Sequence, residues 1–176
     1  QMRELNFLDA RFEARLVGSG HYSTLGRDDA EFYMSANPGE PLKPLGSVAS
    51  GGELSRVMLA IKTVLADEED TPTLIFDEID TGISGITAGK VGEKLKLIGK
   101  SRQVLCITHL PQIAAVADAH YLISKEVAGN SVKTKIELLD DEASAEELAR
   151  MLGGANVTGN ILESAREMKQ LAKSEI

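Results

Sequence analysis

The sequence predicts an α/β protein with a mainly parallel sheet, flanking helices and additional β strands at the N-terminus. Three observations predict this class. Residues 6–37 alternate apolar and charged side chains in the manner of half-buried strands. From residue 54 onward, short apolar strands alternate with helical patterns, which indicates a parallel sheet covered on both faces. Hydrophobic residues make up 43% of the 176 residues, which suits a globular domain with a sizeable core.

The N-terminal elements are predicted as two strands and a long loop. ARFEARLV and AEFYMSA are strand patterns, and the stretch GSGHYSTLGRDD between them has the composition of a turn. NPGEPLKPLGSVASGG is predicted as a Pro/Gly-rich loop that leads to a helix over 54–66. One apolar face is expected on that helix from residues at helical spacing: Leu54, Val57, Met58, Ile61, Val64 and Leu65.

The rest of the chain alternates strands and helices. The predicted order is the strand TLIFD, a helix over 87–98, the strand QVLCIT, a short helix over 111–117 and the strands HYLISK and SVKTKIELL. Ser144 and Glu147 have the S-x-x-E spacing of a capping box before LARML. A helical pattern over 158–172 ends the chain.

The net charge of the chain limits the kinds of partner that it is expected to bind. The net charge of −8 argues against a broad nucleic-acid-binding face on this chain, although it leaves room for a local basic patch. One set of charged residues is predicted as a solvated helix face, with a DNA-contacting patch as the alternative: Lys90, Glu93, Lys94, Lys96 and Lys100.

The sequence also predicts a location. Cys106 lies in an apolar run and is expected to be a small buried hydrophobe; a single cysteine forms no intrachain disulfide, which fits a reducing cytoplasm. No apolar run approaches the ~20 residues that span a bilayer, and charged residues interrupt the N-terminus, so we expect neither a membrane anchor nor a signal peptide. Because the chain begins with Gln1, we expect it to be a portion of a longer protein.

Two adjacent glycines stand at a predicted helix start in SVASGGELSR. Ser50 and Glu53 have the spacing of a capping box, which is a purely structural interpretation. Free N–H groups and the positive end of the helix dipole also form an anion site, and glycines let a phosphate come near. The two interpretations are compatible, so whether this helix start also binds a phosphate depends on motifs elsewhere in the chain.

Carboxylates follow a buried strand in TLIFDEID. Ligands gather at the carboxyl ends of strands in open α/β sheets, and this strand delivers Asp77 and Glu78 to that edge. One carboxylate can hold Mg²⁺ while the next orients or deprotonates a water molecule. The alternative is an ordinary acidic turn, which Asp80 and TGISG also fit.

A histidine follows the next strand in VLCITHLP. His109 stands at a carboxyl edge, where its ring could hydrogen-bond a γ-phosphate. The alternative is a polar group at a strand end that is simply satisfied by its surroundings.

The order of these elements resembles the second half of an ATP-binding cassette (ABC) ATPase. In that resemblance SGGE corresponds to the signature motif, Asp77 and Glu78 to the Walker B pair, Asp80 to the D-loop and His109 to the switch histidine. The P-loop of the first half, G-x-x-x-x-G-K-[ST], is missing, since GITAGKV has one residue too few between its glycines. We therefore expect that this chain alone does not hydrolyse ATP.

The residues that flank these motifs resemble one particular family of cassette ATPases. ASGGELSR, DEIDTGISG, NPGEPLKPL and ITHLPQIAAVADAHYLISK closely resemble the RecN family of SMC-like bacterial DNA repair proteins, and the resemblance covers nearly the whole chain. Gly89 and Gly92 look less typical and are expected to weaken their helix by up to ~1 kcal/mol each.

The family resemblance implies the C-terminal lobe of an ABC/SMC-type P-loop ATPase head. The Walker A motif and a long coiled coil would then lie in an N-terminal segment of the same protein. It further implies a homodimer of heads that binds ATP and Mg²⁺, acting in recombinational repair of DNA double-strand breaks in the cytoplasm, at the nucleoid. Contact with DNA is expected mostly outside this lobe, in keeping with its acidic charge.

The resemblance also implies residue roles. Ser50, Gly51 and Gly52, with Glu53 beside them, would contact the γ-phosphate of ATP held by the opposite head. Asp77 would support Mg²⁺, Glu78 would position the attacking water, His109 would contact the γ-phosphate and Asp80 would communicate across the dimer. The alternatives are a transporter-type ATPase lobe and a non-catalytic binding module that kept cassette motifs. The lobe would divide into a β-rich lead-in and loop (1–46), a motif-bearing core (47–140) and C-terminal helices (141–176).

Overall fold

The computed structural model describes residues 2–5, 7, 9–24, 26–35, 39–48, 51–65, 71–128 and 131–174. These residues form two compact units, and each is described by itself. The first unit comprises Gln1–Ile83 and Leu97–Ile107, and the second comprises Ser84–Lys96 and Thr108–Ile176.

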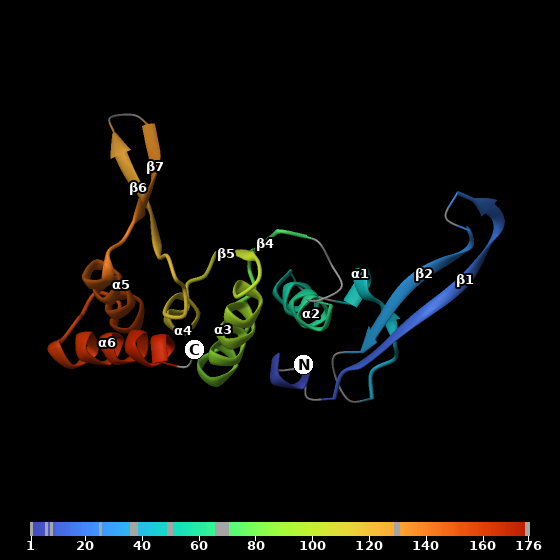
Figure 1. The fold of residues 1–176 in the computed structure, drawn as a ribbon, viewed down its shortest axis with the longest axis horizontal. Coiled ribbons are helices and arrows are strands. Elements are labelled where there is room, and N and C mark those ends of the chain that lie inside the picture. The colour runs from blue at the N-terminus through green and yellow to red at the C-terminus, as the bar shows by residue number, and fades with distance from the viewer. Residues whose placement is uncertain are drawn as a thin grey trace. The chain divides into compact units, whose positions relative to one another are not determined.

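A long antiparallel hairpin begins the first unit, after the short 3-10 helix η1 (Met2–Leu5) (Figure 1). Its strands are β1 (Arg11–Ser23) and β2 (Gly26–Ser35), so both predicted strands are confirmed. The predicted turn of GSGHYSTLGRDD is wrong over most of its length, because the strands continue until Ser23 pairs with Gly26. Polar residues and glycines can pair through their backbones, and a register shift after Gly18 absorbs the irregularity.

The predicted loop after the hairpin also contains regular structure. β3 (Lys43–Pro44) pairs with β2, and α1 (Leu45–Val48) follows directly. Pro44 has no N–H for a sheet ladder, and it stands in the two-residue third strand at the end of the β1-β2-β3 order. The loop prediction is therefore wrong for these residues, since local composition does not reveal pairing with a distant strand.

Helix α2 (Gly51–Val64) confirms the first long predicted helix. The side that it buries differs from the predicted apolar face: the buried residues are Gly52, Arg56, Val57, Leu59 and Ala60. Among the residues predicted for the core, Val57 is fully buried, whereas the exposed fraction is 36% or more for Leu54, Met58, Val64 and Leu65. Apolar residues surround most of this helix, so their spacing did not indicate which side packs inward.

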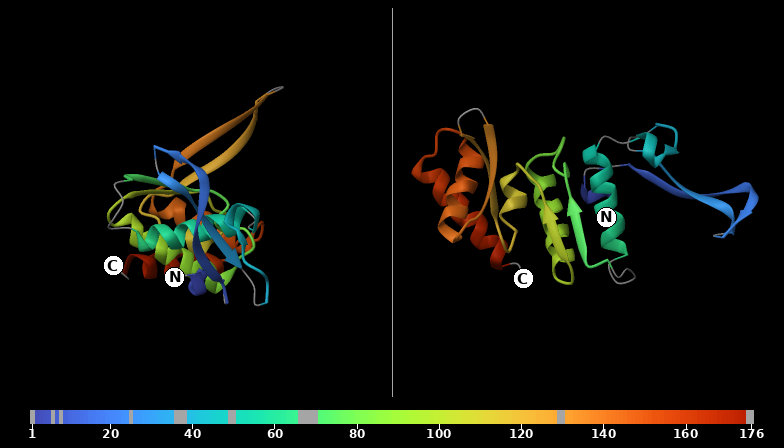
Figure 2. Two further views of the ribbon diagram at one scale, coloured as in Figure 1. Left: turned by 90° about the vertical axis from the view of Figure 1, so that its right-hand side faces the viewer. Right: turned by 90° about the horizontal axis from the view of Figure 1, so that it is seen from above.

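The parallel sheet predicted from sequence is present as two strands. β4 (Thr73–Phe76) pairs in parallel with β5 (Gln103–Cys106), and the two lie side by side in Figure 2. Leu74 and Phe76 are buried on one face of this sheet. The α/β class is therefore confirmed, together with the additional N-terminal strands.

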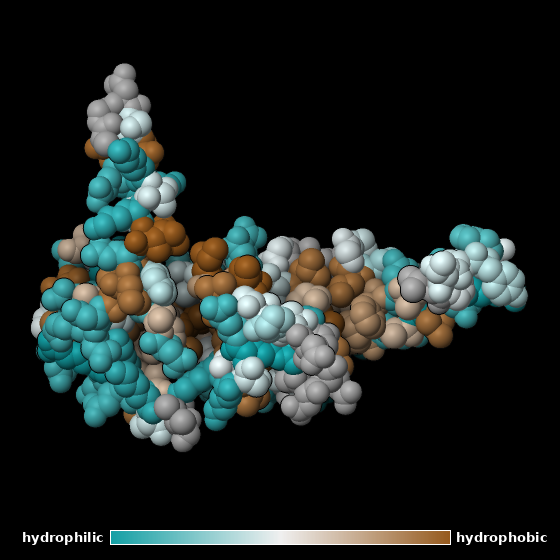
Figure 3. Space-filling model, turned by 45° about the horizontal axis from the view of Figure 1, so that its top comes forward, coloured by the Kyte–Doolittle hydropathy of each residue, from teal (hydrophilic) through white to brown (hydrophobic). Residues whose placement is uncertain are grey.

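The second face of the β4–β5 sheet is open. Ile75 is 69% exposed, and Leu105 and the following Ile107 are 45% and 52% exposed. Figure 3 shows hydrophobic side chains at the surface in the region of these strands. Within the described residues, the prediction of a sheet covered on both faces is thus wrong.

The second unit combines a hairpin with helices. Its elements are α4 (Pro111–Ala114), β6 (Tyr121–Ala128), β7 (Ser131–Leu138), α5 (Asp141–Gly153) and α6 (Gly159–Ser174). Helix α3 (Gly85–Gly99) begins in this unit and ends in the first. β6 was expected to continue the parallel sheet, but it pairs antiparallel with β7 in a separate two-stranded sheet.

Helix α3 carries two glycines in different surroundings. A Cβ on Gly89 would meet no atom within 4 Å, so this residue is free of packing constraints. A Cβ on Gly92 would lie 3.2 Å from the Gln112 carbonyl oxygen and 3.3 Å from a Val116 methyl group. Gly92 therefore lets the residues around α4 approach α3 closely, which the sequence did not indicate.

Helix α5 starts one turn earlier than the predicted capping box. Asp140 is the N-cap, and its Oδ1 accepts a hydrogen bond of 2.8 Å from the Ala143 N–H. Ser144 lies inside the helix, is 2% exposed, and its Oγ is 2.9 Å from His120 Nδ1. The Ser144–Glu147 capping prediction is wrong, because an aspartate four residues earlier offers its carboxylate to the helix entrance.

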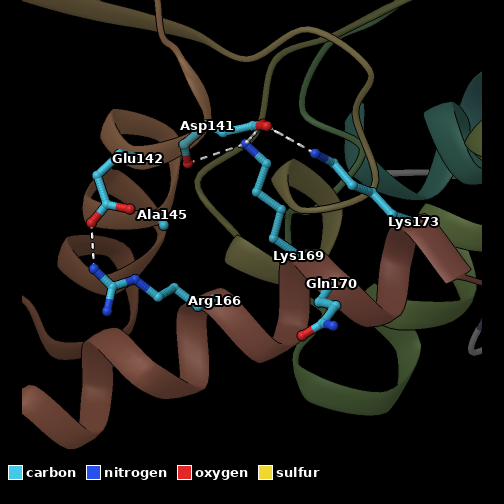
Figure 4. A pocket seen from close by; sticks show the side chains of 7 residues that line it. All are labelled: Asp141, Glu142, Ala145, Arg166, Lys169, Gln170 and Lys173. Carbon is cyan, nitrogen blue, oxygen red and sulfur yellow. Dashed lines mark hydrogen bonds and ion pairs between the residues drawn. The ribbon is translucent and has the colours of Figure 1, made fainter.

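Helices α5 and α6 pack through small and aliphatic side chains. The buried cluster at this contact also includes the end of α4, and its members are Ala114, Ala115, Leu148, Ala149 and Ala165. Ion pairs span the rim of this contact: Asp141 accepts from Lys169 and Lys173, and Glu142 pairs with Arg166 (Figure 4). These side chains line a hollow of about 270 Å³, in which each of the three cations is paired with one of the two carboxylates.

We expect His120 to make the second unit less stable in mild acid. Burial lowers the pKa of its ring, so the unfolded chain binds a proton at a higher pH than the folded chain does. The stabilisation is complete above the unfolded pKa of about 6.5 and is lost as pH falls toward the lower folded value. Urea denaturation at pH 7.5 and 5.5 should show a larger loss for the wild type than for His120→Gln. Equal losses would contradict the prediction.

Candidate functional site

The carboxyl end of β4 carries the acidic motif. Asp77 and Glu78 follow Phe76 directly and are exposed, whereas Asp80 is only 3% exposed. The Glu78 N–H donates a 2.9 Å hydrogen bond to Asp77 Oδ1. Asp77, Glu78 and Asp80 therefore share one turn at this edge of the parallel sheet, as the sequence predicted.

The backbone at Glu78 is strained. Among the described residues, Glu78 is the non-glycine residue with a positive φ, 57°. Such a conformation is costly for a side-chain-bearing residue and is held only where the surroundings determine it. A hydrogen bond of 3.1 Å from the Thr81 N–H to the Glu78 carbonyl closes the turn. The turn thus directs Glu78 against a local backbone preference.

The two glycines of the signature-like motif lie against this turn. A Cβ on Gly51 would collide with Glu78 Oε2. A Cβ on Gly52 would be 2.8 Å from the Glu78 carbonyl oxygen and 2.8 Å from Thr81 Cβ. The absence of side chains at these two glycines therefore lets the Glu78–Thr81 turn pack closely against α2. The Glu78 carboxylate comes to lie at the start of α2, where the helix dipole favours negative charge. Glu53 is half-buried in the first turn of α2, and Ser50 lies outside the described residues.

Two residues whose role no sequence motif indicates, Ser55 and Arg56, tie α2 to the same turn. Ser55 Oγ donates a 2.9 Å hydrogen bond to the Asp77 carbonyl. Arg56 Nη1 donates to the carbonyls of Thr81 and Ile79, at 2.7 and 3.3 Å. A signal for Arg56 existed in the sequence, since a charged residue interrupts the apolar run of α2, but the charge alone did not indicate a partner.

Burial changes the chemistry of two side chains here. Desolvation lowers the pKa of Arg56, although nearby Glu53 acts in the opposite direction. Burial raises the pKa of Cys106 to about 12, and the negative charges of Asp80 and Asp77 add to the effect. Cys106 is therefore a neutral thiol at physiological pH rather than a nucleophile. Its side chain is half-buried, so the fully buried position expected from the sequence is only partly realised.

His109 lies in the second unit. It is exposed and stands between Thr108, whose Oγ1 accepts a 3.0 Å hydrogen bond from the Leu110 N–H, and the buried Pro111 that begins α4. The first unit brings together Gly51, Gly52, Glu53, Asp77, Glu78 and Asp80.

The acidic turn offers exposed carboxylates at which a magnesium ion could be held. Within the parts of the chain that the structure describes, no group of three or more His, Cys, Asp or Glu side chains is arranged to hold a metal ion. Mg²⁺ usually takes one or two protein carboxylates and completes its shell with phosphate and water oxygens. Asp77 offers one such exposed carboxylate, so the residues present fit that mode.

The described helices include none that is long and apolar enough to cross a membrane.

Comparison with known proteins finds a relative whose sequence aligns with nearly the whole chain. No protein-family model matches. The chain is 47% identical over 171 residues to the DNA repair protein RecN of Halalkalibacterium halodurans, and the match takes in 97% of this chain. It takes in 30% of that protein, so the chain spans less than a third of the length of this curated relative.

Solved structures show the same fold. The Smc head domain with a coiled coil and joint from Pyrococcus yayanosii is similar with a TM-score of 0.57 and 21% identity, over 83% of this chain and 26% of that chain. A structure from work on ATP-driven dimerization and DNA-stimulated activation of SMC ATPases has a TM-score of 0.50 and 21% identity, over 88% of each chain. At such identities the likeness shows the fold alone, which is an α/β lobe of the SMC head type. With this fold and a sequence match along nearly its whole length, the chain belongs to the RecN family.

Proposed function

We propose that this chain is the C-terminal lobe of an SMC-like ATPase head that acts in recombinational repair of DNA double-strand breaks. The observation that carries the proposal is the meeting of the Glu78 carboxylate with the glycine start of α2 at the carboxyl end of β4. A carboxylate at a strand end and a helix start that admits an anion are the two parts that a nucleotide-hydrolysing head needs from this lobe.

In the proposed site, each residue has a distinct role. Asp77 holds Mg²⁺, which would neutralise phosphate charge, and Glu78 orients the attacking water and accepts its proton. Ser50, Gly51 and Gly52 receive the γ-phosphate of a nucleotide bound by the opposite head, and Glu53 caps the helix beside them. His109 donates a hydrogen bond to the γ-phosphate. Asp80 transmits the state of the nucleotide site across the contact between the two heads.

The main partner is a segment of the same protein that carries the Walker A motif and the coiled coil. Exposed apolar surface supports such a partner, since Ile75 and Leu105 face outward from β4–β5 and Leu54 and Met58 from α2. Heads would pair into a homodimer around ATP, and the related SMC structure solved in a study of ATP-driven dimerization supports that arrangement. DNA would be contacted mostly by other parts of the protein, in keeping with the net charge of −8, and the protein would act in the cytoplasm at the nucleoid.

Reconstitution tests the proposal directly. The chain is co-expressed with the segment that carries the Walker A motif, and phosphate release from ATP is measured for each piece and for the pair. We expect turnover from the pair and none from this chain alone, because the main phosphate grip lies outside it. A pair that binds DNA but does not hydrolyse ATP would overturn the ATPase assignment.

Ser50→Arg is expected to lower turnover of the reconstituted pair by at least about tenfold, because a bulky cation obstructs the place of the γ-phosphate at the helix start. Circular dichroism should be unchanged. Ser174→Arg, an equal change at the exposed end of α6, serves as the control and should retain activity. Full activity of Ser50→Arg would remove the signature role from this segment.

A further inference from the structure

Arg56 is a buried cation that touches the acidic turn. It lies in the second turn of α2, is 5% exposed, and its Nη1 donates hydrogen bonds to the carbonyls of Ile79 and Thr81. These two carbonyls stand on either side of Asp80. The guanidinium therefore holds the backbone at both flanks of the buried carboxylate residue.

Burying a guanidinium in the core costs desolvation free energy. Taking it from water is unfavourable unless hydrogen bonds compensate, and Arg56 Nε has no hydrogen-bond partner among the described residues. The centroid of the buried Phe7 ring lies 5.6 Å from Arg56 Cζ, within the range of a cation–π attraction. An aliphatic side chain would fill the space without the desolvation penalty, so the two carbonyl hydrogen bonds and the ring contact are what distinguish arginine here.

Neighbouring contacts act on the same turn. Ser55 Oγ donates to the Asp77 carbonyl at 2.9 Å, so adjacent side chains of α2 together hold the carbonyls of residues 77, 79 and 81. Gly52 brings the helix against the Glu78 carbonyl and Thr81. Three hydrogen bonds and the close packing at Gly52 therefore hold the first two turns of α2 against the acidic turn within one compact unit.

We propose that Arg56 is a positioning residue that keeps Glu78 and Asp80 in register with the glycine start of α2. The proposal rests on the proposed function, because Glu78 then acts on water and the helix start on a phosphate. Loss of the two carbonyl bonds would let the strained Glu78 backbone relax, and its carboxylate would leave the reactive geometry while nucleotide binding persists. Arg56 itself touches neither water nor nucleotide.

Three variants test this role. Arg56→Met removes all donors and keeps an unbranched apolar chain, Arg56→Lys keeps a cation with three donors on a chain one atom shorter than the Nη1 that bonds the carbonyls, and Arg102→Met is the control. Arg102 precedes β5, at the end of the two strands opposite to Asp77, since Gln103 pairs with Thr73 and Cys106 with Phe76. All three are measured in this chain and in the reconstituted pair.

The first readout is amide hydrogen exchange of this chain without nucleotide. In Arg56→Met, residues 77–82 should exchange at least about tenfold faster, with α5 and α6 unchanged, because local opening of the turn becomes easier. Arg56→Lys should be intermediate and Arg102→Met should match the wild type in this segment. Unchanged exchange in Arg56→Met, or an equal acceleration throughout α2 and β4, would overturn the proposal, the latter by making Arg56 a general core residue.

The second readout is turnover by the reconstituted pair. Arg56→Met should lower kcat by at least about tenfold with the KM for ATP within about threefold, and Arg56→Lys should restore part of kcat. A rise in KM at constant kcat, or no rescue by lysine, would overturn the positioning role. Failure of the proposed function is distinguishable, since it would appear as wild-type turnover in Glu78→Gln while the exchange experiment still decides whether Arg56 holds the turn.

Discussion

Glu78→Gln is expected to lower ATP turnover of the reconstituted head by about 10²–10⁴-fold, the range that a general base contributes. Glutamine has the size of glutamate but cannot accept the proton of the attacking water. The folded structure should persist, because the residue is exposed and the Gln variant keeps the backbone hydrogen bonds of the turn. ATP binding should also persist, since the roles in phosphate contact belong to other residues.

Single-turnover phosphate release and nucleotide binding, measured on the same preparations, separate these effects. Glu163→Gln provides the control, because this residue is exposed on α6 and plays no part in the proposed site. Equal turnover by wild type and Glu78→Gln would remove the catalytic assignment, whatever the binding data show.

Gly52→Ala is expected to destabilise the first unit by about 1–3 kcal/mol or more, as overpacking of a close contact does. The added Cβ would lie 2.8 Å from the Glu78 carbonyl oxygen, 2.8 Å from Thr81 Cβ and 2.9 Å from the Thr81 carbonyl oxygen. Two of these atoms belong to the backbone of a turn that Ser55 and Arg56 already hold, so relief requires the helix start and the turn to separate.

Gly89→Ala is the matched control for that prediction. Its Cβ would meet nothing within 4 Å, and alanine favours a helix over glycine by up to about 1 kcal/mol, so this variant should be as stable as the wild type or more stable. Urea denaturation of the three proteins, followed by circular dichroism, compares them. Wild-type stability of Gly52→Ala would contradict the close contact between α2 and the acidic turn.

The same contact revises the interpretation of the glycine pair. The sequence suggested that something approaches the backbone at Gly51 and Gly52, and the structure identifies one such neighbour as the Glu78–Thr81 turn of the same chain. A phosphate in the proposed dimer would meet a helix start whose geometry this turn already determines. The requirement for glycine is therefore structural at Gly52, which faces backbone atoms, whereas a Cβ on Gly51 would meet the movable end of the exposed Glu78 side chain; the proposed binding role adds to both positions.

Short-range patterns in the sequence predicted much of the fold. Alternation in ARFEARLV, the helical spacing after Gly52, and the apolar runs before Asp77 and after Arg102 depend only on neighbours a few residues apart, and all these elements are present. The acidic turn was likewise predictable, because a buried strand has two ends and the residues after it must emerge at one of them.

Long-range choices were decided by the tertiary structure. Strand partners, such as β6 with β7 rather than with the parallel sheet, depend on chain segments that no local pattern identifies. Which side of α2 packs inward depends on where the Asp77–Thr81 turn lies, and so do the partners of Arg56 and the fit of Gly52. The sequence by itself determined which residues are apolar, acidic or glycine and where along the chain they fall. Only the folded chain decided which of them touch, because burial and hydrogen bonding are satisfied by groups far apart in sequence.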